Sequence, residues 1–274
     1  MKNDISVILT VHNKNWLIDK VIDSIVLNTV ATLELNIVID GCTDNSEQVV
    51  INTLKKHPNI HTNIFHTPDV FETKANNVGL RAASSDHVVI VQDDMIINEF
   101  AWDQRLIKPI LEYPDVFAVT AQTAHNWIYN SNSIHVNMAE NLDNCWCDIL
   151  VHTDHAEKGK ISRDTFAIRD TVNRGPLLLK HDILQKLDYL DEDFSPQDMD
   201  DHDLCFRAYK ELGLLAGCYW LDIVSEHSWG GTRPNGHTPA PWLFNAHHKN
   251  TKIVWQRHAD LITGPKHNEN RSLK

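Results

Sequence analysis

Hydrophobic and polar positions in the first third of the chain alternate between the strand period and the helix period. Residues 5–11 (ISVILTV) form a short run rich in β-branched side chains, which is typical of a buried strand. Apolar residues from Leu17 to Val26 then recur at intervals of three and four, as on one face of a helix. The same succession continues, with strands predicted at residues 35–39, 60–65 and 87–91 and helices at residues 46–56 and 73–83.

Repeated strand–helix–strand units of this length predict an α/β fold with a mainly parallel central sheet and helices on both faces. Ligands of such sheets bind beyond the carboxyl ends of the strands. Polar residues follow three of the predicted strands at that edge, namely His12 with Asn13, then Asp40, then Asp93 with Asp94. Their convergence predicts a binding site there.

The later two thirds of the chain are less regular. A helix at residues 101–111 and a strand at 116–121 are predicted, but residues 125–169 show no strong period. That polar segment is either a functional loop, such as a lid or an acceptor-binding insertion, or a set of short strands that the pattern does not reveal. Its aromatic residues could stack on sugars or pack in a core, and they include Trp127, Tyr129 and Trp146. Further elements are predicted at residues 173–179, 182–187, 204–212 and 215–221.

Composition narrows the classes of function. The 274 residues are 42% hydrophobic and 23% charged, as in an ordinary globular protein. The formal net charge of −12 disfavours nucleic acid as a partner, although the 17 histidines would outweigh that charge if all were protonated. No apolar run reaches the roughly 20 residues of a membrane span and no signal peptide is recognised, so we expect a cytoplasmic protein without a transmembrane segment.

Asp93 and Asp94 have two interpretations. They could simply end a strand in solvent, or they could bind a hard divalent cation that shares its ligands with a substrate diphosphate. His227 would add an imidazole and favour Mn²⁺ over Mg²⁺. The glycine-containing segment 230–233 that follows could fold over an anionic ligand, with Arg233 bound to a phosphate.

A second acidic cluster, Asp200-Asp201-His202-Asp203, opens the helix predicted at 204–212. Acidic residues in a first turn favour the helix dipole, yet three exceed what capping requires. Crowding raises the pKa of at least one of them, which would make it a general base for a hydroxyl. Sequence motifs of P-loop nucleotide hydrolases, dinucleotide-binding dehydrogenases, serine hydrolases and zinc proteases are absent.

Taken together, these segments resemble the family-2 nucleotide-sugar glycosyltransferases, which have the GT-A fold. The resemblance spans about residues 5–232 and implies one domain over residues 1–235. In that domain, about residues 1–115 would form the nucleotide-sugar half and 116–235 the acceptor half, followed by a C-terminal extension at 236–274. The matching segments, in the order of the family, are residues 5–13, 37–46, 74–80, 89–94, 173–179 and 200–207.

The resemblance also implies roles for single residues. Asp40 matches the acid that recognises the base, Asp201 matches the catalytic base, and Asp94 with His227 match the metal ligands. Gln92-Asp93-Asp94 occupies the D-x-D position, with Gln92 in place of its first acid and Asp93 near the ribose. The remaining implied nucleotide-sugar contacts are Thr10, Val11, His12, Asn13, Lys74, Asn77 and Arg233, and those on the acceptor side are Arg174, Gly175, Asp200 and Trp229.

The implied activity is inverting transfer of a sugar from a nucleoside-diphosphate sugar to an acceptor hydroxyl in glycan or polysaccharide synthesis, with Mn²⁺ or Mg²⁺. The acceptor could be a glycan, a lipid-linked molecule or a protein. The C-terminal extension, with Trp242, Phe244 and Trp255, could pack on the domain, touch a membrane or hold an oligomer partner. Two alternatives stay open, namely a sugar-1-phosphate nucleotidyltransferase and a catalytically inactive nucleotide-sugar binder, which Gln92 suggests.

Overall fold

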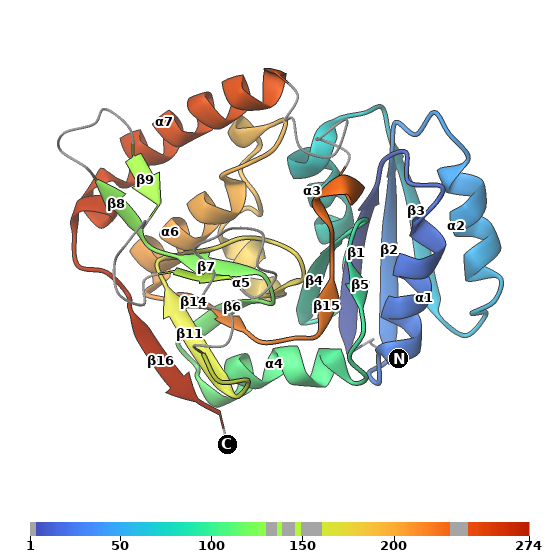
Figure 1. Ribbon diagram of the computed structural model, residues 1–274, viewed down its shortest axis with the longest axis horizontal. Helices are drawn as coiled ribbons and strands as arrows, with labels where there is room; N and C mark the ends of the chain where they lie inside the picture. Colours follow the sequence, from blue (N-terminus) through green and yellow to red (C-terminus); the bar gives the residue numbers. More distant parts are fainter. Residues whose placement is uncertain (1–3, 130–135, 139–145, 149–160, 231–240, 274) are drawn as a thin grey trace.

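A nine-stranded sheet in the order β16–β11–β14–β6–β13–β4–β1–β2–β3 forms the centre of the computed structural model (Figure 1). The four strands of its first half pair in parallel, as predicted, and their ends differ from the predicted ones by only a few residues. These strands are β1 (Ile5–Val11), β2 (Leu33–Asp40), β3 (His61–Thr67) and β4 (His87–Gln92). The structure describes residues 4–129, 136–138, 146–148, 161–230 and 241–273.

Helices cover both faces of the sheet because successive side chains of each strand point to opposite sides. Val7 and Leu9 of β1 face a buried core shared with α1, α2 and α4, whereas Ile8 faces one shared with α3, α5 and α6. Gly79 of α3 lies so close to β1 that a Cβ atom there would be 2.6 Å from Cγ2 of Ile8. The helices are α1 (Ile18–Asn28), α2 (Ser46–Leu54), α3 (Phe71–Ala82), α4 (Trp102–Glu112), α5 (His181–Lys186) and α6 (Asp200–Leu212).

The second half of the sheet mixes strand directions. β13 is antiparallel to both β4 and β6, whereas β14 runs parallel to β6. β11 and β16 extend this edge in antiparallel register. These strands are β6 (Val116–Thr120), β11 (Thr165–Arg169), β13 (Leu177–Lys180), β14 (Leu215–Tyr219) and β16 (Glu269–Ser272).

Short strands occupy the described parts of the segment 125–169, for which the sequence showed no regular pattern. In those parts the prediction of a set of short strands is confirmed. Trp127 is only 1% exposed, and its indole Nε1 donates a hydrogen bond to the Thr171 hydroxyl at 3.2 Å, so it is a core residue and not a sugar platform. The side chains of Tyr129 and Trp146 lie outside the described residues. The short strands of the molecule are β5 (Ile96–Ile97), β7 (Thr123–His125), β8 (Trp127–Tyr129), β9 (Val136–Met138), β10 (Trp146–Asp148), β12 (Thr171–Val172) and β15 (Ile223–Val224).

The C-terminal segment belongs to the same folded body. α7 (Pro241–Thr263) lies along one end of the molecule beside α6 (Figure 1), where Val254 and Phe206 join a third buried cluster. β16 then pairs with β11 at the edge of the central sheet, with Glu269 opposite Ile168. The described part of the predicted C-terminal extension therefore packs on the domain and adds the edge strand β16 to the central sheet.

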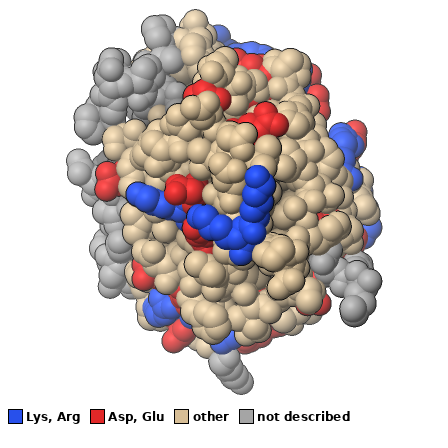
Figure 2. All heavy atoms as spheres, turned by 90° about the vertical axis from the view of Figure 1, so that its right-hand side faces the viewer, with Lys and Arg blue, Asp and Glu red and all other residues tan. Residues whose placement is uncertain are grey.

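The face formed by α1, α2 and β3 is mostly uncharged, with a short run of basic side chains beside acidic ones (Figure 2). Lys56 pairs with Asp23 there at 3.3 Å, so opposite charges partly neutralise each other. None of the helices in the described ranges combines the length and the apolar character that crossing a bilayer requires.

Candidate active site

Two cavities adjoin at the carboxyl edge of the parallel strands. The first cavity has a volume of about 360 Å³ and the second about 460 Å³. Glu72, Gln92 and Gln197 line both, so the two cavities share a wall. Arg174 and Asp201 line the second cavity. The sequence-predicted residues that line the first are Thr10, His12, Asp40, Gln92, Asp93 and Asp94.

Asp93 is held in place at the end of β4. Its Oδ2 accepts a hydrogen bond from the His12 amide at 3.0 Å, and its Oδ1 lies 3.3 Å from the Lys14 ammonium. Burial raises the pKa of Asp93, and the charge of Lys14 opposes that rise. Lys14 also donates a hydrogen bond to the carbonyl of Trp229 in the short helix η2 (His227–Trp229), which brings η2 beside the first cavity.

Asp94 offers a free oxygen in the first cavity. Its Oδ1 is buried and has no hydrogen-bond partner among the described residues. Burial, followed by the nearby charge of Asp93, raises the pKa of Asp94 to about 7. Such a carboxylate oxygen suits a hard divalent cation, because the cation adds positive charge beside a buried carboxylate that Lys14 only partly compensates. The donor set therefore fits Mn²⁺ or Mg²⁺.

Asp40 shapes the end of β2. Its buried carboxylate accepts hydrogen bonds from the Thr67 hydroxyl and the Val70 amide, both at 2.7 Å, and from the Phe71 amide at 2.9 Å. These donors lie between β3 and the start of α3, so Asp40 fixes that turn. Two oxygens with about four acceptor positions already receive three bonds, which leaves about one position for a base.

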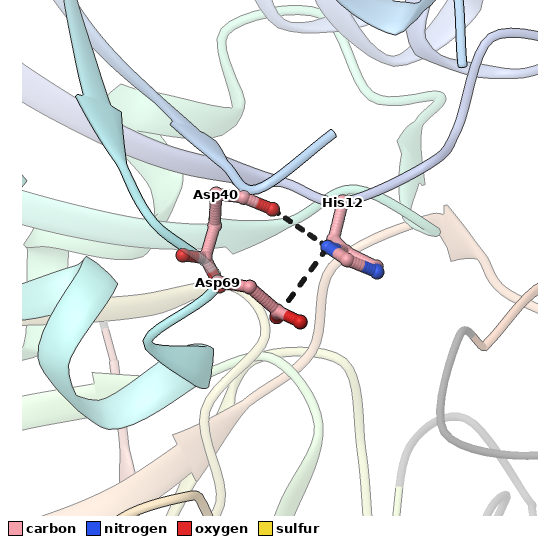
Figure 3. A group of neighbouring side chains, drawn as sticks. All are labelled: His12, Asp40 and Asp69. Carbon is pink, nitrogen blue, oxygen red and sulfur yellow. Dashed lines mark hydrogen bonds and ion pairs between the residues drawn. The ribbon is translucent and has the colours of Figure 1, made fainter. Parts of the chain in front are cut away.

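His12, Asp40 and Asp69 form a corner of the first cavity, with potential ligand atoms within 4.8 Å of one another (Figure 3). His12 Nδ1 lies 2.6 Å from the backbone oxygen of Asp40, so that nitrogen carries a proton and is not available to a metal. It lies 3.8 Å from Oδ1 of Asp69, whose side chain is 51% exposed. The corner therefore suits hydrogen bonding to a ligand better than it suits a cation.

Asp201 is the acid of its cluster that lines the second cavity. Its Oδ2 accepts a hydrogen bond from the Arg174 amide and its Oδ1 one from the His202 amide, both at 2.9 Å. Next to Arg174, Gly175 has a φ of 109°, and a Cβ there would lie 2.6 Å from Oε1 of Gln92. Glycine thus permits the close approach that joins this segment to the shared wall.

The other two acids of the cluster are buried and paired. Asp200 forms an ion pair with the Arg174 guanidinium. Asp203 pairs with Arg207 at 2.6 Å and His258 at 2.8 Å. Although burial raises the pKa of Asp203, these hydrogen bonds lower it overall. Asp200 and Asp203 belong to the described lining of neither cavity, which distinguishes them from Asp201.

Several predicted nucleotide contacts hold the fold together instead of lining a cavity. Asn77 is buried, and its amide donates to the Leu190 carbonyl at 2.8 Å and accepts from the Leu190 amide at 3.1 Å. Val11 is a core residue of β1. Asn13 accepts a hydrogen bond from the Thr43 amide at 2.8 Å, which ties β1 to the loop after β2.

Trp229, predicted on the acceptor side, lies instead beside the first cavity, where its ring centroid is 6.3 Å from that of Trp16. The reason is its backbone contact with Lys14, which draws η2 towards the end of β1. Lys74 lies on α3 and belongs to the described lining of neither cavity. The side chain of His227 and all of Arg233 lie outside the described residues.

Sequence reasoning missed the contribution of α7. Trp242, in its first turn, lines the first cavity and packs edge-on against Phe71, with 5.1 Å between ring centroids. Local patterns could not reveal a contact between segments so far apart. Lys14 and Asp69, in contrast, closely follow predicted strands, so the sequence could have indicated that they line the cavity. The other missed residues are Glu72, Asn76 and Gln197, and, in the second cavity, Gln122, Asn173, Asp198, Leu243, Phe244 and His247.

A comparison with sequence families finds one whose model covers many residues of the first cavity. The family model described as glycosyl transferase family 2 matches residues 6–173, which is more than half of the chain and includes the lining residues from Thr10 to Asp94. The chain belongs to glycosyl transferase family 2. A comparison of this family 2 chain with curated proteins finds no match.

Solved structures show that this family 2 protein has the GT-A fold. Glucosyl-3-phosphoglycerate synthase from Mycobacterium tuberculosis, in complex with Mn²⁺, UDP-glucose and phosphoglyceric acid, has a TM-score of 0.57 and 18% identity over 93% of this chain and 79% of that one. The mannosyltransferase PcManGT from Pyrobaculum calidifontis, in complex with GDP-Man and Mn²⁺, has a TM-score of 0.58 and 14% identity over 95% of this chain and 72% of that one. S. aureus TarS 1-349 has a TM-score of 0.52 and 15% identity over 78% of this chain, and the match covers only 57% of the TarS chain.

Proposed function

We propose that this protein is an inverting, metal-dependent glycosyltransferase that moves a sugar from a nucleoside-diphosphate sugar to an acceptor hydroxyl in glycan or polysaccharide synthesis. The observation that carries the proposal is the shared wall of the two cavities, with Asp94 in the first and Asp201 in the second. A donor in the first cavity and an acceptor in the second would meet at this wall.

The first cavity suits a nucleoside diphosphate. Asp94, with His227 from η2, would hold Mn²⁺ or Mg²⁺, which when bound neutralises charge that develops on the leaving diphosphate. Support for His227 comes from the contact between Lys14 and η2, which keeps that segment beside Asp93. Arg233 would add a further positive charge near the phosphates. In the corner that it forms with His12 and Asp40, Asp69 would accept hydrogen bonds from the base.

Asp201 would act as the general base. It would accept the proton of the acceptor hydroxyl while that oxygen attacks the anomeric carbon of the donor sugar. The bond between that carbon and the diphosphate oxygen breaks as the new bond forms on the opposite face, so the configuration inverts. The products are the glycosylated acceptor and a nucleoside diphosphate. The amides of Arg174 and His202 would keep the Asp201 carboxylate oriented for this step.

Gln92 stands where the family has an acid, which alone would favour an inactive binding protein. However, its Nε2 donates a hydrogen bond to Oε1 of Glu72 at 2.9 Å, and Glu72 lines both cavities. The charge of Glu72 also contributes to the raised pKa of Asp94. A carboxylate from α3 is therefore close to the position that Gln92 leaves uncharged, which supports an active enzyme.

The proposal is tested with UDP-glucose, UDP-N-acetylglucosamine and GDP-mannose, each with and without Mn²⁺ or Mg²⁺. We expect at least one donor to raise the unfolding midpoint only when a cation is present, because a ligand of the native state stabilises it by mass action. NMR of the transfer product should show the inverted anomeric configuration. Retention of configuration, donor stabilisation without a cation, or no stabilisation by any donor would contradict the proposal.

A further inference from the structure

The second cavity carries amide side chains suited to hydroxyl groups. Gln122, Asn173 and Gln197 line it, and each amide can both donate and accept, as a hydroxyl does. Asn173 is anchored by its backbone, which donates to the Thr123 carbonyl at 2.8 Å and accepts from the Thr120 hydroxyl at 2.6 Å. Its side-chain Oδ1 is buried and has no hydrogen-bond partner within the described part of the chain. This oxygen is therefore free for a ligand donor.

The basic side chains in the described lining are already neutralised. Arg174 is only 5% exposed, and its guanidinium pairs with Asp200 and lies 3.5 Å from Asp201 and 3.6 Å from Glu72. Burial lowers the pKa of Arg174, but the charges of Glu72, Asp201 and Asp198 raise it overall, so it stays charged. Its Nη1 nevertheless lacks a hydrogen-bond partner in the described ranges. Arg174 can thus donate to a ligand without offering a net positive site.

His247 is the other basic group of this lining, and it pairs with Asp198 at 2.6 Å. The hydrogen bond that His247 donates to Asp198 raises the pKa of His247, and the Asp198 carboxylate offsets the positive charge of the protonated imidazole. The acids Glu72, Asp198 and Asp201 therefore balance or exceed the positive charges around the second cavity. A phosphate or carboxylate placed there would be repelled, whereas an uncharged polar molecule would not.

Phe244 gives the second cavity an apolar face. It lies in the first turns of α7, lines the cavity and is 63% exposed, beside Leu243. An exposed aromatic face next to amide groups matches a sugar ring, which has hydroxyls at its edge and C–H groups on its face. The volume of about 460 Å³ falls in the range of small-molecule sites, roughly 300–1,000 Å³.

We infer that the second cavity binds an uncharged carbohydrate acceptor, with Phe244 packed on its ring and Asn173, Arg174 and the two glutamines bonded to its hydroxyls. This inference rests on the proposed transferase function and adds the chemical class of its acceptor. It excludes acceptors whose reacting end is a phosphate or a carboxylate, such as lipid phosphates and phosphorylated acids.

The test measures nucleoside diphosphate release by the full chain with a cation and the donor that stabilises it. Neutral acceptors are methyl glycosides of glucose, galactose, mannose and N-acetylglucosamine and their common disaccharides, and anionic acceptors are glucuronic acid, glucose 6-phosphate and 3-phosphoglycerate. We expect at least one neutral acceptor to raise the rate tenfold or more above every anionic one. A preference for an anionic acceptor, or no response to any neutral one, would overturn the inference. Failure of every donor to bind would instead reject the transferase function itself.

Phe244→Ala gives a second readout. We expect the KM for the neutral acceptor to rise by roughly five- to tenfold, from the loss of an aromatic contact, while the donor KM and kcat change less than twofold. Phe244→Tyr should restore the wild-type KM. Phe100→Ala is the matched control, because Phe100 is 71% exposed and lies outside the described lining of both cavities. An unchanged acceptor KM in Phe244→Ala, or an equal change in Phe100→Ala, would contradict stacking.

Discussion

The backbone amide of Arg174 donates a hydrogen bond to Oδ2 of Asp201 at 2.9 Å. The segment that leads into β13 thereby fixes a carboxylate at the start of α6, while the Arg174 side chain pairs with the neighbouring Asp200. Arg174 thus contacts two buried acids, because its guanidinium pairs with Asp200 and lies 3.5 Å from Asp201, which also accepts the hydrogen bond from its amide. Asp201 is the acid of the cluster that lines the second cavity, so it is the one placed to accept a proton from a ligand.

Asp201→Asn should lower kcat by about a hundredfold or more, since a general base typically contributes 10²–10⁴. Its unfolding free energy should also fall, by roughly 1–3 kcal/mol, because the buried side chain loses the acceptor oxygen of one of its two amide hydrogen bonds. The kcat is therefore compared per folded molecule. Asp203→Asn is the matched control on the same helix, and it breaks a buried pair, which should cost roughly 3 kcal/mol of unfolding free energy. Its kcat per folded molecule should stay near the wild-type value. Initial rates and urea unfolding of both variants test this, and a wild-type kcat in Asp201→Asn would reject Asp201 as the base.

Cation binding should release a proton from Asp94. Its pKa of about 7 without a cation means that the carboxyl is largely protonated at pH 6 and ionised at pH 8. Because the cation binds the ionised form, its affinity should fall by up to about tenfold per pH unit below 7 and level off above it. Calorimetry with Mn²⁺ in buffers of different ionisation enthalpy measures the released proton. An affinity that does not change between pH 6 and 8 would contradict this assignment.

Asp40 and Asp69 should respond differently to the same change. Asp40→Asn replaces one of the two oxygens that together accept three hydrogen bonds with an amide that cannot accept, and it should cost roughly 2–3 kcal/mol of unfolding free energy. Asp69→Asn, at a half-exposed side chain, should leave stability nearly unchanged and weaken nucleoside diphosphate binding by about tenfold. Thermal unfolding and calorimetric titration separate the two effects. Nucleotide affinity that depends on Asp40 alone would show that Asp69 does not contact the base.

Acid should destabilise the protein through the buried pair His125 and His202, whose rings lie 4.6 Å apart. Burial lowers the pKa of His202 from 6.5 to about 4 and that of His125 well below 6.5, so both are neutral when folded. Their contribution to stability is complete above pH 6.5 and is lost as the pH falls below it, down to about pH 4 for His202, at up to about 1.4 kcal/mol per pH unit for each.

Urea unfolding between pH 7.5 and 5 measures this slope, and His202→Gln should reduce it. His66→Gln is the control, since His66 is exposed on β3 and pairs with Glu47 at the surface. A slope that His66→Gln reduces as much as His202→Gln would show that the buried pair is not responsible.

The first half of the fold could be predicted because its information is local. Each of β1, β2 and β4 is a short apolar run that ends in a polar residue, so both the parallel sheet and its ligand edge follow from the pattern. Asp93 and Asp94 lie at that edge for the same reason. The strand β3 was equally visible, although its side chains are mostly only partly buried.

The rest of the site depends on contacts that no local pattern contains. The α7 residues Trp242 and Phe244 reach the cavities only because β16 and α7 pack against elements much earlier in the chain. The position of Trp229 depends on its contacts with Lys14 and Trp16, near the end of β1. Asp40 accepts hydrogen bonds from backbone amides in the turn after β3. These bonds depend on the backbone geometry of that turn, which the sequence around Asp40 does not reveal.

The central claim is that the donor and the cation bind in the first cavity and the general base lies in the second. Calorimetric titration of the nucleoside diphosphate of the preferred donor, with Mn²⁺ present, tests it most directly. The account predicts that Asp94→Asn weakens binding by about tenfold or more through loss of a charged ligand, whereas Asp201→Asn binds within about twofold of the wild type. Wild-type affinity in Asp94→Asn, or an equal loss in Asp201→Asn, would contradict a donor and cation in the first cavity with the base in the second.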